Sequence, residues 1–499
     1  MLDLYLAGLQ YFTNPMMYLV IFAGVFIGTA FGALPGLTAS TTIAIFLSFT
    51  FGIDPVISFA FLLGLYQGAV YGGSISAIVI NIPGTPGAIA TGLDGHEMAK
   101  RGEAGKAIGI ATIASAIGGI LSVFALAYFA PIIANVALKF SAQEFVGIAL
   151  LGLSIIAFIS PGSMTKGLIS GVLGLIIGIV GLDTISGYPR FVYGINDLTT
   201  GVNMVPVMIG LYGLSEMFVN ISEKPAQKVV MQKIKNTIPK MKEVVGLWAT
   251  YLRSSIIGVI IGAIPAAGAS IASLVAYGQE KRFSADGDKM GTGTLKGVAA
   301  PEAANNASVG GALIPLLTLG VPGDAMTAVL MGALIINGLR PGPMLFKEQM
   351  PFVSSIFISL IIATLFMVVI GLFGAKYFAK LLNMPREYLM PVIMLFCMIG
   401  SFAIRDSFFD LYVVLGAGLI GFFLRKIGFS PAPLILGMIL GPIFESNLRR
   451  AMILSRGDWS TFVTRPISLL MLVLTFLVLF GPNILKFIKT NLIKAKKSI

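Results

Sequence analysis

Cysteine and histidine are almost absent from the sequence, which contains only Cys397 and His96. These two side chains cannot form a disulfide framework, a haem or iron–sulfur site, or a zinc centre built from His and Cys. The motifs of ATP hydrolysis, serine hydrolases and zinc peptidases are also missing, and His96 is expected in a charged, solvated loop. The sequence therefore predicts no enzyme and no bound cofactor.

Charge is scarce as well: charged residues make up 11% of the 499 residues, against about 25% in an average soluble domain. Hydrophobic residues make up 56%, and long apolar runs recur from Met16 to Leu485. Because about 20 apolar residues cross the hydrocarbon of a bilayer, most of the chain is expected to lie in lipid. The 59 glycines and 25 prolines favour broken helices, which a membrane bundle tolerates. We therefore predict an all-α integral membrane protein.

The apolar runs form two sets that are separated by a polar stretch. About seven runs precede residue 222, a second set lies between residues 247 and 445, and a last run covers 466–485. The predicted organisation is a first membrane repeat (1–221), a basic linker (222–246), a second membrane repeat (247–455), and an extra transmembrane helix with a basic tail (456–499).

The net charge of +12 comes largely from two short segments. The linker 222–246 holds six lysines, and the tail from Lys486 onward holds five lysines and no acid. Basic segments beside membrane spans stay on the cytoplasmic side, so both segments are expected there. Because these lysines lie beside apolar spans, the lipid bilayer is the expected partner of this charge and nucleic acid is not.

Internal repeats relate the two sets of runs. GALPGLTAS (32–40) recurs as GAIPAAGAS (262–270), and YGGSISAIVINIPG (71–84) recurs as VGGALIPLLTLGVPG (309–323). Two further pairs follow in the same order: AQEF (142–145) with PREY (385–388), and VPVMIGLYG (205–213) with APLILGMIL (432–440). Colinear matches favour duplication, and an odd number of crossings in each copy inverts the second copy. We therefore predict two inverted-topology repeats.

Two Pro-Gly breaks carry the strongest functional signal, NIPGTPGAIATG (81–92) and LGVPGDAMTA (319–328). Pro-Gly cannot continue a helix, and the helix N-terminus after such a break offers backbone N–H groups to an anion. Each break follows a Gly-Gly and about ten apolar residues, too few to cross, which suggests re-entrant hairpins. The alternative is that Pro-Gly simply marks loops, but matching breaks in both halves favour a binding role.

Candidate site residues gather around these breaks. The substrate-binding candidates are Ser40, Ser74, Asn81, Gly84, Thr85, Pro322, Gly323 and Asp324. The coupling-ion candidates are Thr38, Thr41, Glu302, Asn305 and Asn306. Ser and Thr more often bond to a carbonyl of their own helix. Glu302 fits either a helix face shared with Asn306 or a solvated cap, and Asp324 fits either a helix N-cap or a proton or cation ligand.

These motifs resemble the large membrane subunit of the tripartite tricarboxylate transporters, the TctA family. GALPGLTAS, the run from YGGSISAIVINIPG to LDGHEMAKRGEAGKA, and APEAANNASVGGALIPLLTLGVPGD carry the resemblance, which spans roughly 15–455. It implies two partners, a small four-span membrane subunit and a periplasmic binding protein that captures the carboxylate. It also implies multi-pass insertion in a bacterial inner membrane and an ion gradient, of Na⁺ or H⁺, in place of ATP.

Residues and resemblance together predict the translocating subunit of an ion-gradient-driven, binding-protein-dependent importer of di- and tricarboxylates. A passive anion channel and a stand-alone secondary carboxylate transporter are the alternatives. An elevator-like movement is expected from fold-level analogy with other transporters that have paired re-entrant hairpins.

Overall fold

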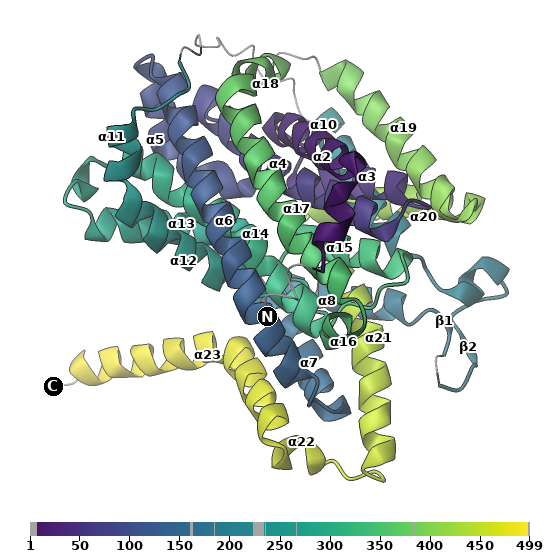
Figure 1. Ribbon diagram of the computed structural model, residues 1–499. Coiled ribbons are helices and arrows are strands. Elements are labelled where there is room, and N and C mark those ends of the chain that lie inside the picture. Colours follow the sequence, from purple (N-terminus) through teal and green to yellow (C-terminus); the bar gives the residue numbers. More distant parts are fainter. Residues whose placement is uncertain are drawn as a thin grey trace. The chain divides into compact units, whose positions relative to one another are not determined.

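The computed structural model describes residues 7–159, 163–183, 185–222, 234, 236–265, 267–382 and 386–497 (Figure 1). Much of the predicted linker 222–246 therefore lies outside the described residues. Within them the chain is largely helical, and its strands are the two-residue β1 (Gly181–Leu182) and β2 (Pro189–Arg190), which pair antiparallel. Among the described segments, seven are long and apolar enough to cross a membrane: Pro15–Ala33, Pro55–Ile80, Ala104–Ala137, Met204–Ser222, Met350–Leu381, Phe408–Lys426 and Pro431–Leu454. The predicted all-α, multi-pass membrane protein is confirmed.

The chain folds as two compact units, and the first comprises Met1–Leu138 and Val205–Phe422. Its helices up to the linker are α2 (Pro15–Ala33), α3 (Ala39–Leu47), α4 (Pro55–Ile80), α5 (Ile89–Lys100), α6 (Ala104–Ala137), α9 (Met204–Met208), the π-helical turn η5 (Ile209–Leu214) and α10 (Ser215–Ser222). Those after it are α11 (Met241–Gly246), α12 (Trp248–Gly262), α13 (Gly268–Phe283), α14 (Leu295–Leu319), α15 (Ala325–Ile336), α16 (Pro343–Glu348), α17 (Met350–Val369), α18 (Ala375–Leu381), α19 (Arg386–Arg405) and α20 (Phe408–Lys426).

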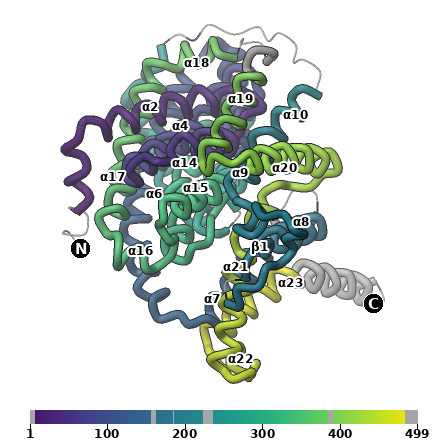
Figure 2. Tube along the Cα trace, turned by 90° about the vertical axis from the view of Figure 1, so that its right-hand side faces the viewer, coloured from purple at the N-terminus to yellow at the C-terminus, as the bar shows by residue number. Residues whose placement is uncertain are grey.

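Two long helices, α4 and α14, form the interior of this unit (Figure 2). α4 packs against α2 from its own half of the sequence and against α17 from the other half. α14 packs against α12 from its own half and against α6 from the other half. Each central helix is therefore enclosed by helices of both halves, and nearly all of its residues are buried.

Glycines make the closest of these helix contacts possible. Glycines recur every four residues along both partners of the first pair, Gly24, Gly28 and Gly32 on α2 and Gly64, Gly68 and Gly72 on α4. A Cβ atom added at Gly68 would lie 2.3 Å from the backbone oxygen of Val25. Small residues at this spacing are the usual way for membrane helices to bring their backbones together.

The expectation that a short arm of about ten residues precedes each Pro-Gly break is wrong. Gly72 and Gly73 lie inside the 26-residue α4, and Gly310 and Gly311 lie inside the 25-residue α14. A glycine pair does not end a helix whose neighbours pack directly against it, since the intrahelical hydrogen bonds are kept. Gly72 faces α2 and Gly310 faces Ser122 of α6, so these glycines serve helix contact.

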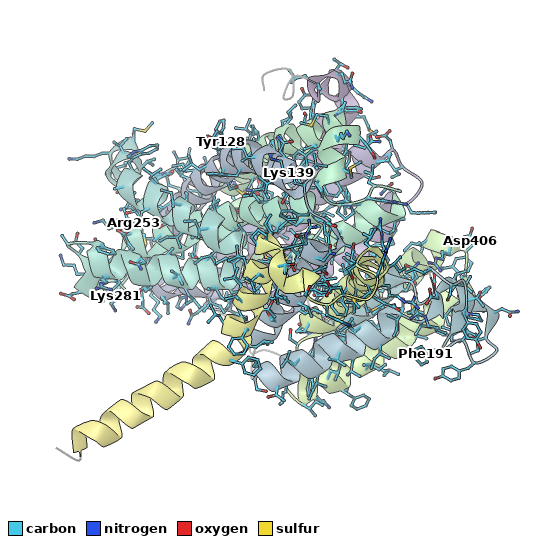
Figure 3. All side chains as sticks on the ribbon, turned by 90° about the horizontal axis from the view of Figure 1, so that it is seen from below. Tyr128, Lys139, Phe191, Arg253, Lys281 and Asp406 are labelled. Atoms are coloured by element: carbon cyan, nitrogen blue, oxygen red, sulfur yellow. The ribbon has the colours of Figure 1, made fainter. Side chains whose placement is uncertain are left out.

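The outer surface of the first unit is apolar along its helices. Phe124 and Tyr128 on α6, Ile256 on α12 and Phe373 after α17 are large apolar side chains that are more than half exposed. Figure 3 shows Tyr128 on this outer surface. Helices that expose large apolar side chains while burying small ones are typical of proteins surrounded by lipid.

The second unit comprises Lys139–Met204 and Phe423–Ile499. Its helices are α7 (Ala142–Ile159), α8 (Met164–Gly178), α21 (Pro431–Leu454), α22 (Thr461–Thr464) and α23 (Pro466–Lys497). α21 packs against both α7 and α8, and α23 packs against α7. β1 and β2 form a small hairpin after α8.

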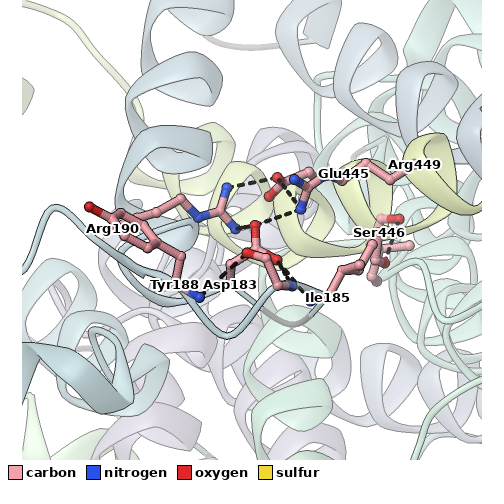
Figure 4. A network of polar contacts seen from close by, with 9 residues as sticks. Asp183, Ile185, Tyr188, Arg190, Glu445, Ser446 and Arg449 are labelled. Atoms are coloured by element: carbon pink, nitrogen blue, oxygen red, sulfur yellow. Dashed lines mark hydrogen bonds and ion pairs between the residues drawn. The ribbon is translucent and has the colours of Figure 1, made fainter.

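An ion-pair network anchors this hairpin to α21 (Figure 4). Arg449 donates to the Asp183 carboxylate at 2.5 Å, and Arg190 reaches both Asp183 at 3.3 Å and Glu445 at 2.7 Å. The backbone N–H groups of Ser186 and Ile185 also donate to Asp183. These backbone bonds, together with the Arg449 guanidinium, hold the pKa of Asp183 well below its usual range.

Candidate functional site

Both central helices end where the sequence predicts, each at a residue in the left-handed conformation. α4 ends at Asn81 (φ 56°) and α14 ends at Gly320 (φ 68°), and each of these residues donates its N–H to a carbonyl four residues back. Asn and Gly adopt this conformation at little cost, so local chemistry explains both ends. A Pro-Gly pair follows each end, and a short helical segment then begins.

The first break packs against the backbone of neighbouring helices. A Cβ atom added at Gly84 would lie 1.9 Å from the Gly32 oxygen of α2, and the Gly84 N–H donates to the Gly73 oxygen at 3.4 Å. Glycine is therefore required here by packing. Substitution of Gly84 would disturb the fold as well as any ligand, so it cannot test a binding role by itself.

The second break is different because it carries its own acid. Asp324 caps the N-terminus of α15: its Oδ1 accepts from the Thr327 N–H at 2.7 Å and from the Thr327 hydroxyl at 2.8 Å. Tyr66 of α4 donates to the other oxygen, Oδ2, at 2.6 Å. Asp324 is thus the N-cap of α15, as one of the two alternatives predicted. A carboxylate at this helix end occupies donors that an anionic ligand would need and repels that ligand.

Gly323 and Pro322 of the second break are buried. A Cβ atom added at Gly323 would lie 2.6 Å from the Ala312 Cα atom, so this glycine is also required by packing. Gly268, at the start of α13, lies against Asp324. The second break is therefore closed by α14 and by the first turn of α13.

A buried polar cluster occupies the middle of α14. The Glu302 carboxylate accepts from the Thr91 hydroxyl of α5 at 2.6 Å and from the Ser115 hydroxyl of α6 at 3.0 Å. The Asn306 amide donates to Ser115 at 2.7 Å, and Gln67 of α4 donates to Asn306 at 3.5 Å. Glu302 has no exposed surface, so the alternative of a solvated cap is wrong. α14 begins at Leu295 and places Glu302 two turns inside.

Asn305 and Thr85 lie where this cluster meets the first break. The Asn305 amide nitrogen donates to the Val70 oxygen of α4 at 3.4 Å, and its oxygen lies against Gly87. The Thr85 hydroxyl lies against Gly73. The Thr85 hydroxyl and the Asn305 oxygen are both buried without a hydrogen-bond partner.

The hydroxyl candidates of the first half form a separate hydrogen-bonded group. The Thr38 hydroxyl lies 2.9 Å from that of Ser40 and 2.8 Å from that of Thr41, and the Thr41 hydroxyl donates to the backbone carbonyl of Tyr212 at 3.1 Å. Thr38 also caps α3. Ser74 donates to the carbonyl of Tyr71 in its own helix at 2.7 Å.

The coupling-ion candidates thus divide between two hydrogen-bonded groups, one at the start of α3 and one on α14. Sequence reasoning missed four partners of the α14 group and the second break: Tyr66, Gln67, Thr91 and Ser115. Gln67 could have been found, because a lone amide inside a long apolar run needs a buried partner. Thr91 and Ser115 are of the small type that membrane helices commonly use for packing, and Tyr66 gave no local signal of its distant partner.

Sequence reasoning also missed Asp94 and misplaced its neighbour His96. The segment expected as a loop is α5, in which His96 is half-buried and its Nδ1 lies 3.1 Å from the Ile78 oxygen. Asp94 is fully buried and accepts from the backbone of Gly291, Gly293 and Thr294 and from the Tyr277 hydroxyl at 2.6–2.9 Å. The available signal was an acid in a glycine-rich segment, with Gly92 and Gly95 close to it. Through these hydrogen bonds Asp94 connects α5 to the segment that leads into α14.

Comparison with known proteins agrees with this architecture. The family model described as "Tripartite tricarboxylate transporter TctA family" matches residues 18–436. The chain belongs to the TctA family. The resemblance predicted from the Pro-Gly motifs is confirmed, and TctA proteins are components of tripartite transporters, which implies further subunits.

Two relatives of this TctA protein come from Agrobacterium vitis. The "Uncharacterized 52.8 kDa protein in TAR-I ttuC' 3'region" is 39% identical over 461 residues, which cover 92% of each chain. The "Uncharacterized protein in TAR-II ttuC' 3'region" is 41% identical over 211 residues, 42% of this chain and 87% of the relative. No solved structure matches the chain.

Proposed function

We propose that this TctA protein is the translocating subunit of an ion-gradient-driven importer of di- and tricarboxylates in a bacterial inner membrane. The observation that carries the proposal is the polar cluster of Glu302, Asn305 and Asn306, fully buried beside a helix break in a membrane protein. Buried ionisable and amide groups are costly among membrane helices and usually mark a substrate or ion pathway.

The packing of α4 and α14 supports two inverted-topology repeats. Each central helix contacts the helix two elements before it in its own half, α2 for α4 and α12 for α14. Each also contacts a long helix of the other half, α17 or α6. The matched sequences 32–40 and 262–270 span the same local features, the end of one helix, a break and the start of the next. Equivalent contacts of this kind between the two halves are expected when the halves are related by a pseudo-two-fold axis in the membrane plane.

The breaks supply the substrate-binding part of the proposal. Asn81 and Thr85 lie at or just after the end of α4, Ser74 lies about two turns before it, and Ser40 lies in the first turn of α3. We propose that the substrate carboxylate binds near the first break, because the second break already holds the Asp324 carboxylate. Alternating access then follows from movement of the helices that carry the breaks against a scaffold, with sliding favoured by analogy.

Two partners complete the proposed transporter, a small four-span membrane subunit and a periplasmic binding protein. The reason is that the described chain is taken up by helices of the two units and contains no soluble domain for substrate capture. A binding protein also explains how one membrane subunit serves a defined carboxylate.

Uptake by proteoliposomes tests this function. The vesicles contain this chain with its membrane partner, and labelled di- and tricarboxylates are added with and without the binding protein. We expect accumulation above equilibrium only with the binding protein and an inward Na⁺ or proton gradient. Simple equilibration would indicate a channel, and accumulation without the binding protein would indicate a stand-alone transporter.

A matched pair of variants tests whether uptake depends on the first break. Thr85→Val removes a buried hydroxyl without changing the shape of the side chain, and we expect uptake to fall at least about tenfold. Thr318→Val is the control, because the Thr318 hydroxyl is equally buried but donates only to Ile314 of its own helix. Equal uptake by the two variants would contradict a role for this break.

A further inference from the structure

Two buried oxygen atoms at the first break have no hydrogen-bond partner, and they point to a ligand. They are the Thr85 Oγ1 atom and the Asn305 Oδ1 atom. Thr85 is 5% exposed and Asn305 is 0% exposed, so bulk solvent does not reach them. Buried polar atoms in proteins are nearly always bonded, and an exception needs an explanation such as an ion.

Glycines leave the space in which these two oxygens lie. A Cβ atom added at Gly87 would lie 2.1 Å from Asn305 Oδ1, and one added at Gly73 would lie 2.3 Å from Thr85 Oγ1. The bond from the Asn305 nitrogen to Val70 fixes which end of the amide faces the break. Val70 and Gly73 are one turn apart on the same face of α4, so both oxygens line one region between α4, the break and α14.

The charge beside this region is a single carboxylate without a cation. Glu302 lies three residues before Asn305, on the same face of α14. Its two oxygens accept from the hydroxyls of Thr91 and Ser115, the Asn305 side chain is a further hydrogen-bond partner, and among the described residues no ion pair with Lys, Arg or His is found for it. Unlike Asp94, this fully buried carboxylate has no backbone N–H donor among the described residues, so a proton or a bound cation would compensate its charge.

The two unpartnered oxygens favour a metal cation over a proton. A proton on Glu302 would neutralise the carboxylate but would leave the Asn305 amide oxygen without a partner. An anion is disfavoured because an amide oxygen is an acceptor only. A divalent ion is disfavoured because the described residues contain no group of three or more acidic, His or Cys side chains. One carboxylate with neutral oxygen ligands suits a monovalent hard cation.

We propose that Thr85, Asn305 and Glu302 bind Na⁺ at the first break and that this ion couples transport to the gradient. The inference rests on the proposed function and names its coupling ion. The bound cation would tie the break to α14 and place a positive charge beside the proposed carboxylate site. Because the C-terminus of α4 carries partial negative charge, the helix end adds to the attraction for a cation.

Na⁺ binding by the purified full-length chain, without partners or carboxylate, tests the site. Melting temperature is followed as NaCl replaces choline chloride or KCl at constant ionic strength, and ²²Na⁺ binding is measured in parallel. We expect Na⁺ to raise the melting temperature of the wild-type chain while K⁺ has little effect. An identical response to Na⁺ and choline would overturn the proposal, and so would protection that follows pH and ignores Na⁺.

Variants of the proposed ligands test whether Na⁺ binds at this site. Thr85→Val and Asn305→Ala should each weaken Na⁺ affinity at least about tenfold, as expected for loss of a ligand or its support. Thr85→Ser keeps the hydroxyl and should retain wild-type affinity, and Thr318→Val is the matched buried control. Wild-type affinity in both Thr85→Val and Asn305→Ala would refute the site.

Uptake by the complete assembly distinguishes the two proposals. Accumulation that persists without Na⁺ and follows a proton gradient would refute the Na⁺ site and leave the importer function intact. Na⁺ binding that is lost in both variants, without carboxylate uptake by the wild-type assembly, would support the site and refute the importer function.

Discussion

The buried carboxylate of Asp94 shows how this membrane protein stabilises a negative charge without a basic side chain. Asp94 has no exposed surface, and its two oxygens accept from three backbone N–H groups, the Tyr277 hydroxyl and the Thr294 hydroxyl. Backbone donors around a carboxylate give charge-assisted hydrogen bonds, which are roughly twice as strong as neutral ones. Asp94 therefore connects α5 to the segment before α14 without a buried basic residue.

Asp94→Asn should destabilise the chain by about 2 to 3 kcal/mol, because the amide nitrogen would face backbone donors and lose charge-assisted bonds. The measurement is the melting temperature of the purified protein in detergent. Asp286→Asn is the control, since Asp286 lies in an exposed pair with Lys289. A melting temperature for Asp94→Asn equal to that of the control would contradict the structural role.

Asp183 gives a prediction for acid pH. Its pKa is lower in the folded protein than its usual range, so the folded state favours the charged form. The stabilisation is complete above about pH 4, the ordinary pKa of Asp, and is lost as pH falls towards the folded pKa. Asp183→Asn should lower the melting temperature at pH 7, and this difference from wild type should shrink below about pH 4. Asp197→Asn, an exposed residue of the same loop, should show no such difference. A difference that grows on acidification would contradict the sign.

At the scale of elements, glycine spacing sets how closely helices approach. Gly68→Ala should destabilise the α2–α4 contact, because the added Cβ would lie 2.3 Å from the Val25 oxygen and force the backbones apart. Gly278→Ala on α13 is the matched control, since no atom lies within 4 Å of its added Cβ. Melting temperatures of both variants check the prediction. We expect a marked loss for Gly68→Ala and no loss for Gly278→Ala, and an unchanged or raised melting temperature for Gly68→Ala would show that helix propensity outweighs packing.

Helix ends that depend on local chemistry could be predicted from the sequence, whereas features that depend on packing between distant segments could not. The ends of α4 and α14 were predictable, because Pro-Gly after Asn81 or Gly320 stops a helix by local chemistry. The continuity of α4 through Gly72 and Gly73 was not, because it depends on which helix packs against those glycines. The bond between Tyr66 and Asp324 joins residues 258 apart, and no local pattern specifies such a partner.

At the scale of the whole molecule, the described contacts of the second unit give it two chemically different ends. Lys166 near the start of α8 donates to the Ile427 carbonyl, shortly before α21, while Asp183 after α8 pairs with Arg449 near the end of α21. Arg465, just before α23, pairs with Glu144 at the start of α7, which packs on the same end of α21. The hairpin and the start of α23 therefore share one end of this unit, and the lysine-rich tail from Lys486 onward forms the last part of α23.

Cysteine labelling in intact cells tests the resulting orientation. Because five lysines in the tail and six in the linker favour the cytoplasm, Lys494→Cys and Lys242→Cys should react with a membrane-impermeant maleimide only after permeabilisation. Tyr193 is 83% exposed and lies beside the hairpin, at the end of its unit that is expected to face the periplasm if the lysine-rich tail is cytoplasmic. Tyr193→Cys should therefore react in intact cells. The wild-type chain is the control, since Cys397 is buried. Labelling of either lysine position in intact cells would reverse the orientation, and the proposed binding protein would then face the wrong end of the transporter.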